Sequence, residues 1–455
     1  MGAFQGNQIP SRSPWLQQLD ADSVPRPLDR NRSADVAIVG AGIAGVATAF
    51  FTLRDTSADV VLIERNRVAR GATGHNAGQL ASYFERPLCD LVDAYGFEAA
   101  IEGQRAFDSA DDLLDEMMAQ AGVKARVERV IGHMGMFSLN HLQVHLRNSL
   151  LRQQGGLRVD ACVVSRDAEF LGDIPVEYAA LYSVVPQGQI QEMLSTTDDR
   201  YRAVLSSPRA CANSALIVQQ VLSFLEAQHP QRFTYVDHTP VERIVLGHDG
   251  ATVRALGHEV VAGKVVLCTN GFVDHLVEDV TGVSSRPPAV RRVVGYVAAY
   301  LEDAERGANV MSYIRNETIG GDTPYVYATR RTFDSSAGPS TLTCFGGPEV
   351  VISAEDVYDA GAQFPSAILD EIDTDIRPIV DSARDSGVSY EFAWHGLMAY
   401  TENKIRLIGF DAHNRALLYN LGCNGVGFLQ SIYGGQRISR LVGGEQLPPS
   451  IFDPA

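Results

Sequence analysis

Residues 34–64, ADVAIVGAGIAGVATAFFTLRDTSADVVLIE, decide the fold of this chain. A short run rich in β-branched residues, Val36 to Val39, leads directly into the motif Gly40-x-Gly42-x-x-Gly45. The small and apolar residues that follow can continue as a helix, and a second apolar run then ends in an acid. The order of strand, glycine turn, helix, strand and carboxylate predicts a dinucleotide-binding unit.

The three glycines and the acid each have a physical reason for their positions. Gly40 permits a tight turn, Gly42 lets the backbone approach a pyrophosphate, and Gly45 lets the helix pack closely on the strand. The N-terminus of that helix then presents free N–H groups and a partial positive charge to the phosphates. Glu64 can accept hydrogen bonds from both hydroxyls of an adenosine ribose and would repel a 2′-phosphate, which argues against NADP.

A membrane span is the alternative for this stretch, because residues 36–53 are nearly all apolar. Arg54 and Asp55 end the apolar run, however, and its start is rich in glycine. The whole chain is 45% hydrophobic and 20% charged, which is typical of a soluble enzyme. We therefore expect no membrane association.

Charge and cysteine usage narrow the function further. The net charge of −17 disfavours nucleic acid or an anionic membrane surface as a partner. The six cysteines are scattered without a C-x-x-C pair or a metal-ligand spacing, so we expect free thiols and no metal site. The N-terminus lacks a basic patch followed by an apolar core, so we expect no signal peptide and a cytoplasmic location.

The length of 455 residues predicts two or three domains. We expect an α/β (α+β) chain with an N-terminal arm over residues 1–33, pinned by Trp15 and Leu16. A Rossmann-like nucleotide-binding domain is expected to be discontinuous, over residues 34–90, 205–285 and 391–455. A substrate-binding or cap domain, built on an antiparallel sheet with flanking helices, is expected over residues 91–204 and 286–390.

Periodicity supports this division. Apolar residues at helical spacing predict helices over 88–121, 139–154 and 354–384. Residues 290–350 alternate apolar and polar in several runs, which indicates antiparallel strands. The segment 313–327 contains Gly320 and Gly321, which indicates a lid.

A second glycine turn, residues 422–428, precedes the last helix of the chain. A nicotinamide enzyme normally needs one such turn, whereas two turns at opposite ends of the chain suit a long cofactor held at both ends. A helix N-terminus beside the ring of a reduced flavin would stabilise its negative charge. The alternative is that residues 422–428 form a plain connecting loop.

With these motifs, the chain resembles the FAD-dependent glycine/D-amino acid oxidase (DAO) family, and within it the γ-glutamylputrescine oxidase-like and sarcosine oxidase-like branch. The matching segments span nearly the whole chain: 39–45, 62–65, 71–79, 265–271, 394–396 and 422–428. The glycine-rich segment 71–79 is the most specific, because a general dinucleotide-binding fold does not require it.

The resemblance implies FAD, extended through the discontinuous domain with its ring facing the antiparallel sheet. The residues it places at the adenosine and pyrophosphate are Gly40, Gly42, Ile43, Ala44, Gly45, Glu64, Arg65, Val241 and Thr269. Those near the flavin are Thr73, His75, Asn76, Ala77, Gly78, Gln79, Gly425, Val426, Gly427 and Phe428. The glycine-rich turns add Gly71, Ala72, Asn270, Gly271 and Gly422 as cofactor-binding candidates.

Three positions depart from the family pattern. His75 stands where some relatives have an arginine and others a histidine bonded to the flavin, so a covalent link and a neutral hydrogen-bonded histidine are both open. Met398 aligns with the cysteine that tethers the flavin in monomeric sarcosine oxidases, which indicates that this tether is absent. The lysine that those oxidases use with oxygen is replaced within residues 342–345, so a dehydrogenase is an alternative to an oxidase.

The substrate side is predicted less sharply. Candidates on the expected sheet are Tyr325, Tyr327, Arg330, His395 and Tyr400, of which we select His395, Tyr327 and Arg330 as catalytic candidates. Arg330 could form a bidentate pair with a substrate carboxylate. Ordinary packing of the tyrosines and a structural role for His395 are the alternatives.

The resemblance implies oxidation of a C–N bond in a small amine or amino acid, with hydride transfer to flavin N5 and hydrolysis of the imine to an aldehyde or keto acid. The partners would be that substrate and O2 or another electron acceptor, and the sequence defines no oligomeric state. The rival functions are an NAD-dependent dehydrogenase and a flavin-carrying subunit without turnover of its own.

Overall fold

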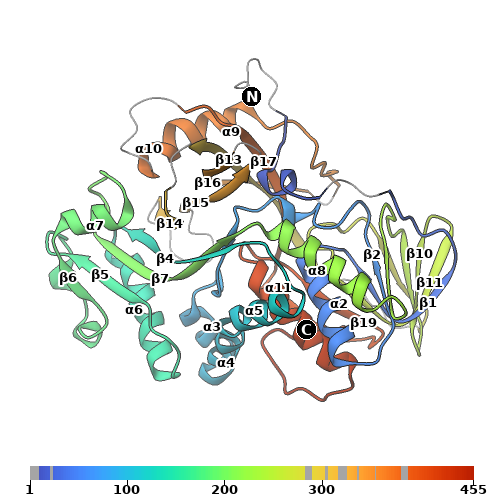
Figure 1. The fold of residues 1–455 in the computed structure, drawn as a ribbon. Coiled ribbons are helices and arrows are strands. Elements are labelled where there is room, and N and C mark those ends of the chain that lie inside the picture. Colours follow the sequence, from blue (N-terminus) through green and yellow to red (C-terminus); the bar gives the residue numbers. More distant parts are fainter. Residues whose placement is uncertain are drawn as a thin grey trace.

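The computed structural model describes residues 10–20, 24–281, 289–302, 306–315, 325–335, 338–353, 355–380 and 388–454. Two large sheets form the framework of the protein, one of nine strands and one of ten. Figure 1 shows the nine-stranded sheet on the right, the core of the ten-stranded sheet above it, and a lobe around β5 and β6 on the left. The expected α/β class with a Rossmann-like half and an antiparallel half is confirmed.

The quoted stretch lies at the centre of the nine-stranded sheet. β1 (Arg32–Val39) is parallel to β2 (Val60–Ile63) on one side and to β11 (His258–Leu267) on the other. Its last four residues and all of β2 are buried, as expected for strands covered on both faces. The remaining strands of this sheet are β8 (Phe233–Val236), β9 (Arg243–Leu246), β10 (Ala251–Ala255), β12 (Leu276–Asp279), β18 (Leu407–Phe410) and β19 (Leu417–Leu421).

Two helices from opposite ends of the chain lie side by side against this sheet. α2 (Ile43–Asp55) follows β1, and α11 (Phe428–Val442) follows β19 (Figure 1). Gly435 of α11 approaches the backbone of α2 so closely that a Cβ there would lie 2.7 Å from the carbonyl carbon of Ala47. The two glycine turns predicted from sequence therefore begin neighbouring helices.

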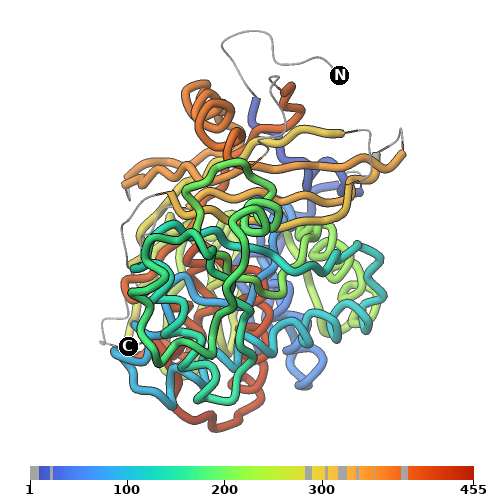
Figure 2. The backbone as a smooth tube through the Cα atoms, turned by 90° about the vertical axis from the view of Figure 1, so that its left-hand side faces the viewer, coloured from blue at the N-terminus to red at the C-terminus, as the bar shows by residue number. Residues whose placement is uncertain are grey.

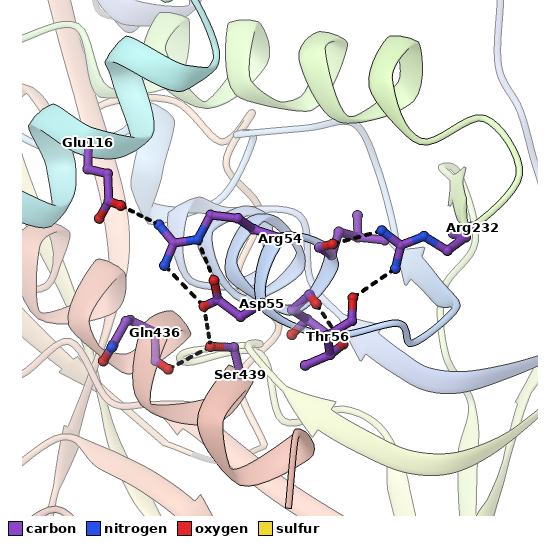
Figure 3. A network of polar contacts seen from close by, with 9 residues as sticks. Arg54, Asp55, Thr56, Glu116, Arg232, Gln436 and Ser439 are labelled. Carbon is purple, nitrogen blue, oxygen red and sulfur yellow. Dashed lines mark hydrogen bonds and ion pairs between the residues drawn. The ribbon is translucent and has the colours of Figure 1, made fainter. Parts of the chain in front are cut away.

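The C-terminus of α2 is held by a polar network from three other segments (Figure 3). Arg54 bonds Asp55 and forms an ion pair with Glu116, and Ser439 of α11 donates to Asp55 at 3.1 Å. Arg232 donates to the carbonyl oxygens of Leu53, at 2.8 Å, and Thr56, at 3.0 Å. These carbonyls lack helical partners, so a guanidinium at this end satisfies them and complements the helix dipole.

Replacing Arg232 by methionine is expected to lower the free energy of unfolding by about 1.5–3 kcal/mol, because hydrogen bonds from a charged donor to the carbonyls at the end of α2 are lost. Urea denaturation measures the change. Arg243→Met is the control, since its ion pair with Glu278 is exposed and worth less than about 1 kcal/mol. Equal losses in both variants would contradict the capping role of Arg232.

The ten-stranded sheet carries the other half of the molecule. Its strands are β17 (Phe392–Thr401), β13 (Val290–Glu302), β16 (Gly338–Ile352), β15 (Tyr325–Ser335), β14 (Asn309–Ile314), β4 (Val127–Met136), β7 (Ala203–Ala212), β5 (Ala161–Ser165) and β6 (Ser183–Val185), with β3 (Gln79–Leu80) paired to β7. Figure 2 shows the orange strands as a layer across the upper part of the molecule. The predicted antiparallel strands within 290–350 are present, and β13, β15 and β16 pair antiparallel.

Helices flank both sheets. They are α1 (Pro14–Gln17), α3 (Leu88–Tyr95), α4 (Phe97–Asp108), α5 (Ala110–Gln120), α6 (Leu139–Gln154), α7 (Gln187–Leu194), α8 (Ser214–Gln228), α9 (Ser366–Glu371) and α10 (Arg377–Val380). The prediction of helix over 88–121 is confirmed as α3–α5, and that over 139–154 as α6. The helix expected over 354–384 is shorter, because residues 355–365 form no helix; positions 354 and 381–387 lie outside the described part.

The expected domain limits cut through elements of the ten-stranded sheet. The limit at 205 falls inside β7, which pairs with β4 and β5, and the segment from 391 begins with β17, which pairs with β13. Strand pairing thus places β7 and β17 in the ten-stranded sheet, while the other strands of these two segments belong to the nine-stranded sheet; the domain division itself stays a prediction. No helix within the described ranges is long and apolar enough to cross a membrane.

Candidate active site

A cavity of about 280 Å³ lies where the two sheets meet, and both glycine turns line it. Most of the predicted cofactor residues face this cavity. They are Gly40, Gly42, Ile43, Ala44, Glu64, Arg65, Gly71, Ala72, Thr73, His75, Asn76, Ala77, Gln79, Val241, Thr269, Asn270, Gly425, Val426, Gly427 and Phe428. Segments nearly 400 residues apart therefore form one continuous surface.

The first glycine turn has the geometry that its sequence predicts. Gly40 has φ +102°, a left-handed conformation, and a Cβ there would lie 2.7 Å from the Cys268 carbonyl oxygen. Gly42 caps the N-terminus of α2 and faces the cavity. A Cβ on Gly45 would lie 1.8 Å from the Gly40 carbonyl oxygen, so only glycine lets α2 pack this closely on the turn.

Four predicted cofactor residues do not line the cavity: Gly45, Gly78, Gly271 and Gly422. Each instead allows a close contact behind the cavity wall. A Cβ on Gly78 would lie 2.8 Å from the Trp15 ring, one on Gly271 2.8 Å from Leu397 and one on Gly422 2.6 Å from Thr401. Their glycine identity is explained by packing rather than by contact with a ligand.

Glu64 lies at the carboxyl end of β2 and holds the turn together. Its Oε2 accepts from the Ala41 N–H at 2.8 Å, and its Oε1 accepts from the Asn66 N–H at 2.9 Å. Burial raises the pKa of this carboxyl group, and the two backbone N–H groups oppose that shift. Because each oxygen retains a second lone pair and Glu64 lines the cavity, the residue fits the predicted role of ribose acceptor.

The segment 71–79 forms the wall between the two sheets. Thr73 Oγ1 accepts from the Ile43 N–H at 3.0 Å, which joins this loop to the start of α2. Asn76 donates to Ser214 Oγ at 2.8 Å and accepts from the Gly78 N–H at 2.8 Å. Gln79 donates to Thr329 Oγ1 of the ten-stranded sheet at 2.8 Å.

His75 lies in this wall and is one of the residues that line the cavity. Its Nδ1 is 2.9 Å from the Gly71 carbonyl oxygen, so Nδ1 carries the proton and donates it there. Burial lowers the pKa of His75, and His395 and Arg70 lower it further. The side chain is therefore a neutral imidazole at pH 7.

The N-terminal arm supports the same loop from behind, as expected from Trp15 and Leu16. Trp15 is completely buried, and its Nε1 donates to the Asn76 carbonyl oxygen at 2.5 Å. Ser13 Oγ donates to the Gly74 carbonyl oxygen at 2.6 Å. A Cβ on Gly74 would lie 2.5 Å from Leu16.

The second glycine turn, residues 422–428, contacts the segment that follows β11. Asn270, with φ +50°, accepts from the Cys423 N–H at 3.2 Å and donates to the Leu397 carbonyl oxygen at 3.1 Å. Behind the turn, Arg406 donates to the Asn420 side chain at 2.7 Å and to its carbonyl oxygen at 2.8 Å. Burial lowers the pKa of Arg406 to about 10, and the residue lines the cavity. Sequence reasoning missed Arg406, because it stands well before the glycine turn in the chain.

The opposite end of the cavity is formed by aromatic rings and carboxylates. Tyr325 and Tyr327 line it, as expected for neighbours at a two-residue spacing on one strand, together with Tyr83 and Glu349. Tyr325 donates to Glu85 Oε1 at 2.7 Å, and burial raises the pKa of Glu85 to about 7. The sequence offered no spacing signal for Tyr83, Glu85 or Glu349, because they come from separate segments.

Arg330 and His395 lie outside this cavity, in contrast to the expectation. Alternation along β15 places Arg330 on the face opposite Tyr325 and Tyr327, where its Nε is 3.4 Å from Thr343 Oγ1. The His395 ring nitrogens lie 3.1 Å from the Tyr358 hydroxyl and 3.1 Å from the Ala362 carbonyl oxygen, contacts that suit the structural alternative. Because side chains alternate between the two faces of a strand, Arg330 and the two tyrosines could have been placed on opposite faces from the sequence.

Two other sequence-based candidates have clear positions. Tyr400 does not line the cavity; its hydroxyl is 3.5 Å from Glu349 Oε1, and a Cβ on Gly425 would lie 3.1 Å from it. Met398, at the position of the expected missing tether, lines the cavity. Most of the segment interpreted as a lid, residues 316–324, lies outside the described residues.

Two helix N-termini, a buried acid after β2 and a cavity closed by an antiparallel sheet define the class of FAD-binding oxidoreductases. The family model described as "FAD dependent oxidoreductase" (DAO) matches residues 35–441. The chain belongs to this family.

Comparison with solved structures agrees with the fold. Glycine oxidase from Geobacillus kaustophilus superposes with a TM-score of 0.65 at 15% identity, over 93% of this chain and 99% of that chain. L-proline dehydrogenase from P. horikoshii superposes with a TM-score of 0.66 at 14% identity, over 93% and 97% of the two chains.

Sequence similarity to curated proteins is confined to a short region. "Gamma-glutamylputrescine oxidoreductase" of Escherichia coli is 30% identical over 104 residues, which is 22% of this chain and 22% of that protein. "Probable oxidoreductase OrdL" of Haemophilus influenzae is 26% identical over 113 residues, 25% of this chain and 26% of that protein. The alignments thus span about a quarter or less of these relatives.

Proposed function

We propose that this enzyme oxidises the C–N bond of a small amine with FAD. The main support for the proposal is that the two glycine turns and the tyrosines line one cavity. Its lining includes Gly40, Glu64, residues 425–428 before α11, and Tyr325 and Tyr327 of the ten-stranded sheet. A long dinucleotide fits one end and the middle, and a small organic substrate fits the other end.

The residues present fit FAD. Gly42 and Gly425 line the cavity without a side chain, and the turns that begin α2 and α11 both line it. Glu64 would hold the adenosine ribose, the start of α2 the pyrophosphate, and residues 425–428 the pyrimidine side of the ring. FAD, when bound, supplies the acceptor for a hydride and so allows two-electron oxidation.

The reaction balances as a loss of two electrons and two protons from the substrate. The carbon next to a neutral amine nitrogen gives up a hydride and the nitrogen gives up a proton, which forms a C=N bond. Water then adds to the imine carbon and ammonia or an amine leaves, which yields an aldehyde or keto acid. Positioning by the tyrosine-lined end and exclusion of water would supply most of the protein's contribution.

The neutral state of nearby side chains suits this chemistry. His75 is uncharged and faces the cavity, and burial raises the pKa of Tyr83 to about 12 and that of Tyr327 further. None of these groups would protonate the substrate nitrogen at pH 8. The expected cytoplasmic location stays a prediction.

The electron acceptor distinguishes an oxidase from a dehydrogenase. Residues 342–345 of β16, within which the oxygen-reactive lysine of some relatives is expected to be replaced, are buried and contain no lysine. This favours an acceptor other than O2. Stopped-flow mixing of reduced enzyme with air-saturated buffer tests it: slow reoxidation supports a dehydrogenase, and rapid formation of hydrogen peroxide supports an oxidase.

Anaerobic titration of the holoenzyme with a panel of primary and secondary amines and amino acids tests the proposed function. Bleaching of the flavin band by an amine is the expected result. A colourless protein that takes up no added FAD would contradict the cofactor assignment. A yellow protein that no member of the panel reduces would instead favour a flavin-carrying subunit without turnover.

We expect the FAD to be held without a covalent bond to His75. The support is the engagement of Nδ1 with the Gly71 carbonyl oxygen and the absence of a tryptophan before the histidine, where Gly74 stands. Precipitating the protein with acid should leave the yellow colour in the supernatant. Colour in the washed pellet that is lost in His75→Ala would establish the histidyl link instead.

A further inference from the structure

The substrate end of the cavity has the composition of a cation-binding site. Three tyrosines, Tyr83, Tyr325 and Tyr327, line it together with Glu349. Aromatic faces attract cations through their quadrupole, and the attraction increases when water is excluded. A carboxylate in the same wall is a further group that can pair with a cation.

A second carboxylate lies directly behind this wall. Glu85 Oε1 accepts the Tyr325 hydroxyl hydrogen at 2.7 Å, and a Cβ built on the cavity-lining Gly425 would lie 3.0 Å from the same oxygen. Removal from water is the main cause of the raised pKa of Glu85, and the negative charge of Glu349 raises it further. Arg209 and Lys404 oppose this shift, so the negative charge at this end of the cavity comes from Glu349 in the wall and from the ionised fraction of Glu85 behind it.

Among the described residues that line the cavity, none at this end is a cationic partner for a substrate carboxylate, and Arg209, 4.3 Å from the centroid of the Tyr83 ring, does not line it. The arginines that line the cavity are Arg65, Arg70 and Arg406, which lie beside the nucleotide-binding turns, and Arg330 is on the far face of β15. A carboxylate placed among the tyrosines would meet Glu349 and the field of Glu85. An amino acid substrate held by its carboxylate therefore does not fit this wall.

We propose that the substrate is a diamine or polyamine, whose remote ammonium group binds among the tyrosines beside the Glu349 carboxylate, with the Glu85 carboxylate behind this wall, while its other, neutral amine is oxidised. The inference rests on the proposed amine oxidation and names its substrate class. Glu349 and Glu85 are then specificity-determining residues and do not take part in the chemical step.

Three five-carbon amines that differ only at the far end test this inference: 1,5-diaminopentane, 1-aminopentane and 5-aminopentanoate. Anaerobic flavin reduction gives a dissociation constant for each with the holoenzyme. We expect 1,5-diaminopentane to bind about ten-fold more tightly than 1-aminopentane, and 5-aminopentanoate more weakly than both.

The outcomes separate the two proposals. If 5-aminopentanoate or 1-aminopentane binds as tightly as the diamine, the diamine assignment is overturned while amine oxidation stands. If none of the three bleaches the flavin, the proposed amine oxidation is contradicted and the diamine assignment falls with it.

Variants that replace a carboxylate by a neutral amide test which residues cause the preference for the diamine. In Glu349→Gln and Glu85→Gln, the ratio of the 1-aminopentane to the 1,5-diaminopentane dissociation constant is expected to fall toward one. Glu98→Gln, on the exposed side of α4, is the matched control and keeps the ratio of the original enzyme. An unchanged ratio in both active-site variants would contradict the assignment of these carboxylates, even if the variants are less stable.

The same ratio is expected to rise between pH 6 and pH 8. Glu85, with a pKa of about 7, gains its charge over this range, and the groups around it are Tyr83, Tyr325, Tyr400, Glu349, Arg209 and Lys404. Loss of the proton from the reacting nitrogen affects both amines and cancels in the ratio. A flat ratio in the original enzyme would exclude Glu85 from binding the ammonium.

Discussion

Gly45→Ala is expected to yield protein that no longer retains FAD and that unfolds at much lower urea concentration. A Cβ at this position would lie 1.8 Å from the Gly40 carbonyl oxygen and 3.3 Å from Leu62. The obstacle is backbone and cannot rotate away, so α2 must move off β1. Overpacking with a flexible neighbour costs about 1–3 kcal/mol, and we expect at least the upper end of that range here. The FAD-to-protein absorbance ratio and urea denaturation measure the two effects.

Two further glycine variants make this prediction specific. Gly188→Ala, in α7 with open space around it, should raise stability by about 0.5–1 kcal/mol and keep the FAD content. Gly42→Ala meets only the Thr73 hydroxyl, at 3.0 Å, so it should fold yet bind FAD weakly because the new methyl group occupies the approach to the phosphates. A Gly45→Ala protein with full FAD content and unchanged stability would show that the close contact of α2 with the turn is unnecessary.

Trp15→Ala is expected to lower the free energy of unfolding by about 3–5 kcal/mol and to weaken FAD binding. The ring is fully buried, contacts Gly78 and lies edge-on to Trp394 with 6.2 Å between ring centroids. Its Nε1–H and that of Trp394 both donate to the Asn76 carbonyl oxygen. Loss of the ring would therefore release the loop that forms the middle of the cavity wall.

The effect on FAD can be separated from a general loss of stability. Phe107→Ala removes an equally buried ring from α4, away from this loop, and should lower stability to a similar degree with a smaller change in the dissociation constant of FAD. Trp15→Phe keeps most of the packing and loses the N–H donor, so it should be intermediate. Equal FAD affinity in the Trp15→Ala and original proteins would contradict a role of the arm in positioning the loop.

The nucleotide half of the cavity was largely predictable because its signals are local. The glycines of the first turn, Glu64 after the second strand and the segment 71–79 are short-range patterns whose spacing follows from one tight turn and one helix start. Some predicted cofactor residues, such as Gly78, do not line the cavity and are glycine because of a close packing contact. A glycine that admits Trp15 and one that admits a phosphate look alike in a sequence.

The substrate half was not predictable to the same degree. Tyr83, Glu85 and Glu349 are individually unremarkable in the sequence and become neighbours only when the segment before α3, strand β15 and the end of β16 meet at the α11 turn. Arg330 lies on the face of β15 opposite Tyr325 and Tyr327, and the sequence alone does not say which face of this strand meets the cavity.

The sequence by itself determined the dinucleotide-binding unit, the second glycine turn and the FAD-dependent family, because these depend on residues a few positions apart. Only the tertiary structure decided which side chains close the cavity, since strand pairing and sheet packing bring distant segments together. The reason is physical: a tight turn is specified by the residues that form it, whereas the charge of a binding site is a sum over neighbours in space.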